Sequence, residues 1–250
     1  IRRRLLIYRR LAVEHPDALS LEPACGTLTP PAQLQQHKTA DAQTKGEVSV
    51  TAAAGAGGGV FDATAVGGGA RVRFGVGGGN EIGVEGTAAF VHNPQDDKNP
   101  KPWFGDSGAY GYKLSWKYSP KPWFAVEAGF GGSASATGDG VGGDLALLFS
   151  RSRGLWRPYV GTRTTIGVPV NRPANDSGGI TPGLVVAGGL AVVPRDDVRI
   201  YLETGMLVAA SQDEPDMYGQ QGWVSHVDGY GGLGLEVRFG HPKKAISASH

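Results

Sequence analysis

The chain has 250 residues, a formal net charge of +1, 41 glycines and one cysteine. The near-neutral charge argues against a nucleic-acid partner, the absence of a Gly-X-Y period excludes collagen, and a single cysteine excludes a disulfide framework or a cysteine-based metal site. No run of about 18 apolar residues occurs, which argues against a transmembrane helix but leaves membrane β-barrels, because only every second residue of their strands faces lipid.

Residues 1–45 differ in composition from the rest of the chain. Residues 1–10 are basic and apolar, like the start of a signal peptide, but neither a clean apolar core nor a cleavage site follows. The sequence TLTPPA at residues 27–32, followed by a glutamine-rich stretch, is typical of a flexible lead-in. We therefore expect a flexible or periplasmic segment over residues 1–45, a folded domain over residues 46–240 and a tail over residues 241–250.

From residue 46 onward, stretches of strand-forming residues recur between clusters of Gly, Pro, Asn and Asp. No part of this region has the 3.6-residue period of an ordinary helix. We expect ten strands, with eight as the alternative, because the glycine triplets at 57–59 and 67–69 could form turns or bulges. The expected strands are residues 47–55, 60–76, 81–91, 107–118, 123–132, 141–150, 156–168, 181–193, 197–210 and 227–239.

The connections between these strands alternate in length. Membrane barrels alternate in the same way between short periplasmic turns and longer outer loops. The short connections are residues 77–80, 119–122, 151–155 and 194–196, and the longer ones are residues 92–106, 133–140, 169–180 and 211–226.

Alternate residues separate each strand into an apolar face and a polar face. In residues 107–118, for example, Leu114 and Trp116 fall on one face and Lys113 falls on the other. Further residues assigned to the apolar face are Leu202, Leu235 and Val237, and their polar neighbours include Glu203 and Arg238.

Three features indicate that the polar face lines the lumen and the apolar face meets lipid. The polar face is rich in Gly, Ala and Ser, which suit a narrow interior, and strands of roughly 9–13 residues match a tilted membrane crossing better than a soluble sheet. Aromatic residues also gather near the strand ends, where two membrane interfaces would select them. A soluble lipocalin-like barrel or sandwich is the alternative. The expected interfacial aromatic residues are Phe74, Phe90, Tyr110, Trp116, Tyr118, Trp123, Phe124, Phe149, Trp156 and Phe239.

The last strand carries Gly234, Val237 and Phe239 at a spacing that resembles the C-terminal assembly signal of bacterial outer-membrane β-barrels. Residues 156–161, WRPYVG, also resemble a strand start common in the small barrels of this superfamily, typified by the transmembrane domain of outer-membrane protein A. The resemblance implies an antiparallel up-and-down barrel in the outer membrane of a Gram-negative bacterium. It also implies that outer-membrane lipids, lipopolysaccharide and the barrel-assembly machinery are partners. In this chain, residues 241–250 follow the signal, whereas the family often ends at the terminal aromatic residue.

The polar face brings equal numbers of cations and anions into the expected lumen. A barrel of eight to ten strands is barely wide enough inside for side chains, so buried charges must pair. A dedicated ion channel would more naturally have a ring of one sign. We therefore expect a mostly closed lumen, with a small pore as the alternative. The expected charge network is Arg71, Arg73, Glu81, Glu85, Lys113, Lys117, Glu127, Asp144, Arg163, Arg199, Glu203, Glu236 and Arg238, with Glu47 as the seventh anion.

The remaining reactive residues form weaker candidate sites. His92 and His226 fall near the expected outer rim, but Ser225 and His226 are adjacent on a strand and point to opposite faces, so they cannot easily share a proton. Cys25 follows Ala24, as in bacterial lipoproteins, but no apolar stretch precedes it, which favours an unmodified thiol. The acidic residues of the outer loops match no EF-hand spacing. We expect no catalytic residue, metal or cofactor.

These observations favour a porin-like barrel with a structural or interaction role, which anchors exposed loops or a periplasmic or surface protein partner. A small-solute channel or transporter is the alternative. An enzyme that modifies lipid or peptide at the outer rim is the lesser alternative.

Overall fold

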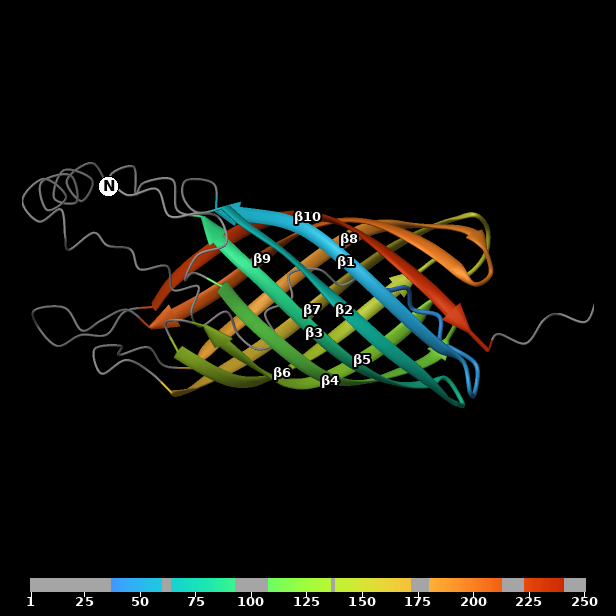
Figure 1. Cartoon of the computed structure of the whole chain (residues 1–250), viewed down its shortest axis with the longest axis horizontal. Coiled ribbons are helices and arrows are strands. Elements are labelled where there is room, and N and C mark those ends of the chain that lie inside the picture. The colour runs from blue at the N-terminus through green and yellow to red at the C-terminus, as the bar shows by residue number, and fades with distance from the viewer. Residues whose placement is uncertain are drawn as a thin grey trace, which may run out of the picture.

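The computed structural model describes residues 37–59, 64–92, 108–135, 138–171, 180–212 and 223–240. Ten antiparallel strands close into a barrel, in which consecutive strands pair and β1 pairs with β10 (Figure 1). The prediction of an all-β, ten-strand, up-and-down barrel is confirmed. Within the described residues, no helix is long and apolar enough to cross a membrane. The strands are β1 (Val48–Gly59), β2 (Thr64–Gly77), β3 (Asn80–His92), β4 (Gly108–Lys121), β5 (Phe124–Ser135), β6 (Gly138–Ser150), β7 (Trp156–Asn171), β8 (Thr181–Arg195), β9 (Val198–Gln212) and β10 (Trp223–Phe239).

The glycine triplets that left the strand count open lie inside β1 and β2. Ala53 pairs with Gly69 and Gly55 pairs with Gly67, so the two glycine-rich stretches form one continuous ladder. At Gly69, a Cβ atom would lie 2.7 Å from the carbonyl oxygen of Gly86 on β3, so this close approach of two strands requires glycine. The triplets therefore belong to the wall of the barrel.

The turn between β2 and β3 depends on glycine for a different reason. Gly77, Gly78 and Gly79 have φ angles of 101°, 62° and 81°, in the left-handed region that other residues rarely adopt. This turn lies at the same end of the barrel as the turns after β4, β6 and β8, and we call this end the short-turn end. In bacterial outer-membrane barrels, the short turns face the periplasm.

The expected longer loop at residues 133–140 is wrong. β5 continues to Ser135 and β6 begins at Gly138, so only two residues separate these strands. The sequence of this region is rich in Gly, Ser and Asp, which are common in loops. Inside a barrel, however, the inward positions of a strand also require small residues. The composition of this region therefore does not distinguish a loop from a strand.

The outer surface of the barrel is apolar and the interior is polar, the reverse of a soluble protein. Leu114, Leu202 and Leu233 are each more than half exposed, whereas Lys113 and Glu203 are buried. The strands have 12 to 17 residues and run obliquely around the barrel axis (Figure 1), as expected for strands that cross a membrane.

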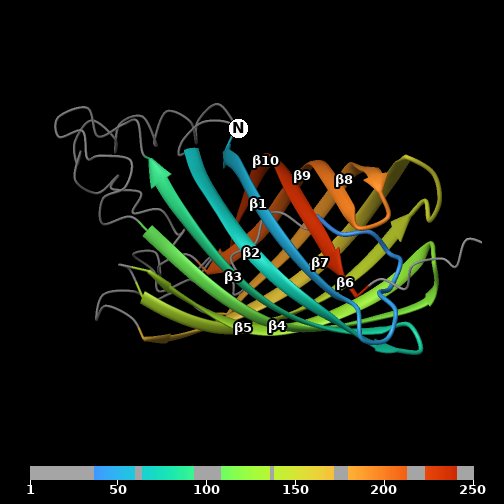
Figure 2. The same cartoon turned by 45° about the vertical axis from the view of Figure 1, so that its right-hand side comes forward.

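Residues 37–47 lie within the barrel at the short-turn end, where β1 begins and β10 ends (Figure 2). We call residues 37–45 the lumenal segment. The sequence assigned these residues to the lead-in before the barrel, whereas the structure buries His37, Lys38, Thr39 and Gln43 among the lumen side chains. Residues 1–36 and the tail at 241–250 lie outside the described residues.

Candidate functional site

The structure brings the thirteen predicted lumen charges together inside the barrel. Each of these side chains is exposed by 8% or less. They occupy inward positions on eight strands, all except β1 and β8, because successive residues of a strand point to opposite faces. Glu47, just before β1, is buried with them.

Glu81 is shared by two cations from neighbouring strands. Arg73 on β2 places its Nη1 atom 3.3 Å from Glu81 Oε2, and Lys117 on β4 places its Nζ atom 3.0 Å from the same oxygen. Arg73 also contacts Glu236 on β10 through its other terminal nitrogen. These pairs join β2, β3, β4 and β10 across the lumen.

A second group lies farther from the short-turn end. Arg71 and Glu85 form a bidentate pair, with Nε–Oε2 and Nη2–Oε1 distances of 2.8 and 2.5 Å. Lys113 Nζ lies 2.7 Å from Asp144 Oδ2 and 3.2 Å from Glu127 Oε1. Such bidentate and shared contacts offset the desolvation of buried charges.

The third group is rich in arginine. Arg238 Nε lies 2.6 Å from Glu236 Oε1, and Arg238 Nη1 lies 3.4 Å from Glu47 Oε1. Arg199 Nε is 3.8 Å from Glu236 Oε1. These contacts leave two adjacent guanidinium groups with only part of the anionic charge that they require.

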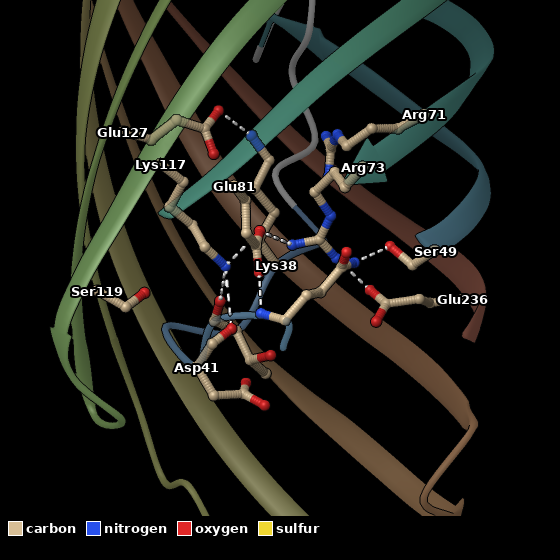
Figure 3. Close-up of polar contacts among 12 residues, drawn as sticks. Lys38, Asp41, Ser49, Arg71, Arg73, Glu81, Lys117, Ser119, Glu127 and Glu236 are labelled. Carbon is tan, nitrogen blue, oxygen red and sulfur yellow. Dashed lines mark hydrogen bonds and ion pairs between the residues drawn. The ribbon is translucent and has the colours of Figure 1, made fainter. Parts of the chain in front are cut away.

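The lumenal segment supplies the missing carboxylate. Asp41 accepts two hydrogen bonds from Arg199, at Nη1–Oδ1 2.9 Å and Nη2–Oδ2 2.6 Å. Asp41 Oδ2 is also 3.9 Å from Arg238 Nη2 and 3.7 Å from Arg157 Nη1. Lys38, at the other end of the segment, forms an ion pair with Glu127 on β5. Figure 3 shows both residues among the side chains of the barrel wall.

Lumen side chains also satisfy the backbone of the lumenal segment, which pairs with no strand. The His37 amide donates to Glu203 Oε2 at 2.7 Å, and the Gln43 amide donates to Glu81 Oε1 at 2.5 Å. Lys117 Nζ donates to the carbonyl oxygen of Asp41 at 3.0 Å. The contacts join residues that are 38 to 166 positions apart in the chain, so the complete set requires β3, β4 and β9 to surround the segment.

Three lumenal tyrosines extend the network. Tyr159 and Tyr230 donate to Glu203, with O–O distances of 2.8 and 3.1 Å, and Tyr201 donates to Glu236 at 2.8 Å. Strand parity places Tyr201 on the polar face with Arg199 and Glu203, but the expected charge network includes none of the three tyrosines, because tyrosine is as common at membrane interfaces as in a lumen. Sequence reasoning also missed Arg157, at the start of β7, and His37, Lys38 and Asp41, which lie outside the strands.

Among the described residues, most of the charges occupy one half of the lumen, although Asp228 takes an inward position of β10 in the other half. Beyond Lys113, Asp144 and Arg163, toward the outer end, most inward positions carry small residues; the main exceptions are Val185, Leu207 and Tyr230, which pack together on β8, β9 and β10. The small inward residues of this half are Ala53, Gly55, Gly67, Gly69, Thr87, Ala89, Gly111, Ser133, Gly142, Thr165, Gly167 and Gly205.

The expected interfacial aromatic residues lie on the outer face, in agreement with their strand parity. Most of them are about half exposed, while Phe90 and Phe124 are partly covered. Trp123, Phe124 and Phe149 pack against one another beside the turn after β4, with ring centroids 5.1 to 6.4 Å apart. This cluster lies at the short-turn end.

The structure gives Gly234 a role beyond the expected assembly signal. A Cβ atom at this position would lie 3.1 Å from His37 Cγ, so the glycine makes room for the lumenal segment. Phe239 ends β10 and is exposed on the outer face, and Val237 lies on the same face.

The other candidate sites receive no support from the described residues. The side chains of His92, Ser225 and His226 lie outside the described residues, as does Cys25. Within the described ranges, no group of three or more His, Cys, Asp or Glu side chains could hold a metal ion.

No protein-family model and no curated protein matches the chain. Solved structures do match it. Neisserial surface protein A is 13% identical with a TM-score of 0.38, and the alignment covers 77% of this chain and 96% of that one. The outer-membrane protease OmpT from Escherichia coli is 8% identical with a TM-score of 0.39, over 77% and 96%. An outer-membrane channel from Pseudomonas putida F1 is 9% identical with a TM-score of 0.46, over 82% and 100%.

The fold is that of an outer-membrane β-barrel. The closed barrel, its even number of antiparallel strands, its apolar outer surface and its polar interior are the properties of single-chain barrels in bacterial outer membranes. The chain is therefore located in the bacterial outer membrane.

Proposed function

We propose that this protein is a closed structural and interaction barrel, which anchors its exposed loops or a protein partner in the outer membrane. The observation that carries the proposal is the ion-paired seal at the short-turn end, where the lumenal segment completes the charge network through Asp41 and Lys38. Outer-membrane lipids and lipopolysaccharide would surround the outer face. No catalytic role is proposed.

The physical argument concerns the cost of opening the lumen. Removing one partner from a buried ion pair leaves an uncompensated charge and costs about 3–5 kcal/mol. A channel for ions or small solutes would need a continuous water path past Tyr201, Glu236 and Lys117, which are almost fully buried. Paired charges of both signs also form no ring that would select one type of ion.

Planar-bilayer recording of the purified full-length protein tests the proposal. We expect no steady single-channel current from the wild type. Lys38→Glu would place a carboxylate beside Glu127 and displace the lumenal segment, so this variant should conduct. Lys45→Glu makes the same charge change at an exposed position of the same segment and should stay silent. A large, steady current in the wild type would contradict the proposal.

One observation favours a small-solute channel as the second candidate. Arg163 is buried near the middle of the barrel, and its described contact is with Asp144, 4.0 Å away. This guanidinium borders the half of the lumen that small residues line. If the wild type conducts and Arg163→Ala changes its ion selectivity, the channel function is the better description.

A further inference from the structure

We propose that the outer surface at the short-turn end carries a binding site for an anionic phospholipid, formed by the turn between β4 and β5 and the turn between β6 and β7. Lys121, Arg151 and Arg153 bind the phosphate of the headgroup, and neighbouring apolar side chains contact the glycerol and the upper acyl chains. The inference goes beyond the proposed function, because it depends on the membrane location of the barrel and not on a closed lumen.

The two turns lie side by side at the short-turn end, on the right in Figure 1. The backbone amide of Ser150 donates to the carbonyl oxygen of Trp123 at 3.0 Å. The rings of Trp123 and Phe149 also stack, with centroids 6.4 Å apart. Residues 119–123 and 150–156 therefore form one continuous surface, and we call these two stretches the basic turns.

The basic turns carry exposed cations without acidic neighbours in the same turns. Lys121, Arg151 and Arg153 are all exposed. Neither basic turn contains an aspartate or a glutamate. Within the part of the chain that the structure describes, none of the three cations forms an ion pair. Their positive charge is therefore available to an anion from outside the protein.

The next turn along the barrel, between β8 and β9, provides a contrast. The backbone amide of Val193 donates to the carbonyl oxygen of Leu155 at 2.8 Å, so this turn lies directly beside the second basic turn. Its cation, Arg195, contacts Asp197 through two hydrogen bonds of 3.0 and 2.9 Å. Asp196 is exposed in the same turn. The turn between β8 and β9 thus neutralises its own cation, whereas the basic turns do not.

The backbone of the second basic turn is held in a defined shape. Gly154 has a φ angle of 96°, in the left-handed region that favours glycine. Its carbonyl oxygen accepts a hydrogen bond from Arg157 Nε at 3.1 Å, and the Arg151 amide donates to the carbonyl oxygen of Pro158 at 3.0 Å. The guanidinium carbon of Arg151 lies 4.0 Å from the place that a Cβ atom of Gly154 would take. Because the turn is ordered before binding, a ligand does not have to order it.

Apolar side chains place the basic turns at the edge of the membrane. Trp123, Leu155 and Trp156 are each about half exposed on or beside the outer face. Tryptophan in membrane proteins favours the level of the lipid headgroups. Cations at this level lie close to the lipid phosphates, and each one strengthens the attraction to anionic lipid by about fivefold. A zwitterionic headgroup carries an ammonium group beside its phosphate, so three cations favour a headgroup with a net negative charge, such as phosphatidylglycerol.

Native mass spectrometry of the purified full-length protein, titrated with phosphatidylglycerol or phosphatidylcholine in a nonionic detergent, tests the site. We expect the wild type to retain phosphatidylglycerol in preference to phosphatidylcholine. Arg153→Gln should weaken the binding of phosphatidylglycerol by about fivefold, and Lys121→Gln, Arg151→Gln and Arg153→Gln together by about a hundredfold. Arg195→Gln makes the same charge change as Arg153→Gln at the same end of the barrel and should leave binding almost unchanged.

Three outcomes would overturn the proposal. Equal weakening by Arg153→Gln and Arg195→Gln would show attraction to the overall charge of this end, and equal retention of the two lipids by the wild type would show that the headgroup is not recognised. Displacement of phosphatidylglycerol by an equal concentration of inorganic phosphate would show a site for a free anion. None of the substituted residues belongs to the lumen network, so the variants should keep the conductance of the wild type, and this site is tested separately from the seal.

Discussion

At the scale of single residues, Asp41 has the most demanding position in the barrel. Its carboxylate faces Arg199, Arg238 and Arg157, and the bidentate contact with Arg199 is the closest of the three. Asp41→Ala should lower the free energy of unfolding by about 3–5 kcal/mol, because it leaves buried guanidinium charge without its partner. Unfolding in urea, followed by the loss of heat-modifiable mobility on gels, measures the change.

Asp197→Ala is the matched control for this prediction. Asp197 also pairs with an arginine, Arg195, at 2.9 Å, but both side chains are well exposed, at 36% and 72%. Exposed pairs contribute about 0–1 kcal/mol. If both variants lose the same free energy of unfolding, water reaches the arginine cluster, and this result would contradict a seal at the short-turn end.

Lys38 gives the seal a pH dependence. Burial lowers the pKa of Lys38 to about 7, although Glu127 opposes the shift. In a released segment, Lys38 would have its usual pKa of 10.5. At a pH between these two values, docking of the segment therefore releases a proton from Lys38. Docking becomes more favourable as the pH rises from about 7 to 10.5. Burial likewise lowers the pKa of His37. For Asp41, burial raises the pKa, but Arg199 more than offsets this effect and holds it well below its usual range.

All three shifts have the same sign, so acid should favour release of the lumenal segment. In planar bilayers, brief openings of the wild type should become rarer as the pH is raised from 7 to 10. Lys38→Met removes the titrating group and should abolish this trend in that window. Openings that become more frequent with rising pH would show that the sign is wrong.

At the scale of the strands, alternation explains both the success and the failures of sequence reasoning. The alternation of residues along β9 assigned Leu202 to the outer face and Glu203 to the lumen, and the structure agrees. This works because inward and outward residues of a membrane barrel differ sharply in polarity. Parity could not locate the end of β5, where Gly, Ser and Ala serve equally well in a loop and in a lumen. The lumenal segment has no strand period of its own, and its contacts come from distant strands, so no local signal predicted its position.

The strand faces lead to a prediction for β9. Leu202 is 57% exposed on the outer face, and Leu202→Arg should destabilise the folded barrel in lipid vesicles by about 2–4 kcal/mol if the site lies near the bilayer midplane. Trp156→Arg, at the start of β7, should cost only about 0–1 kcal/mol, because the penalty for a lipid-facing charge is smaller near the membrane interface. Equal costs at the two sites, measured by urea titration in vesicles, would contradict the assignment of the lipid face.

At the scale of the whole molecule, the barrel and its seal are separable. Every strand pair, including the closure between β1 and β10, involves residues from Val48 onward. The strands therefore hold the wall together, and the lumenal segment contributes buried polar contacts without adding a strand. The sequence predicted the wall and its charges, since both follow from periodicity, but the seal depends on a chain path that periodicity does not encode.

Two truncations distinguish the wall from its seal. A chain that lacks residues 1–45 should still form a heat-modifiable barrel, but without Asp41 the cluster of Arg157, Arg199 and Arg238 at the periplasmic mouth keeps an excess of positive charge. This barrel should conduct, and its reversal potential in a salt gradient should show anion selectivity. A chain that lacks only residues 1–36 keeps the lumenal segment and should stay closed at neutral pH. If both truncated barrels conduct equally, the seal is formed by residues before His37, and if neither conducts, the wall charges close the lumen without the segment.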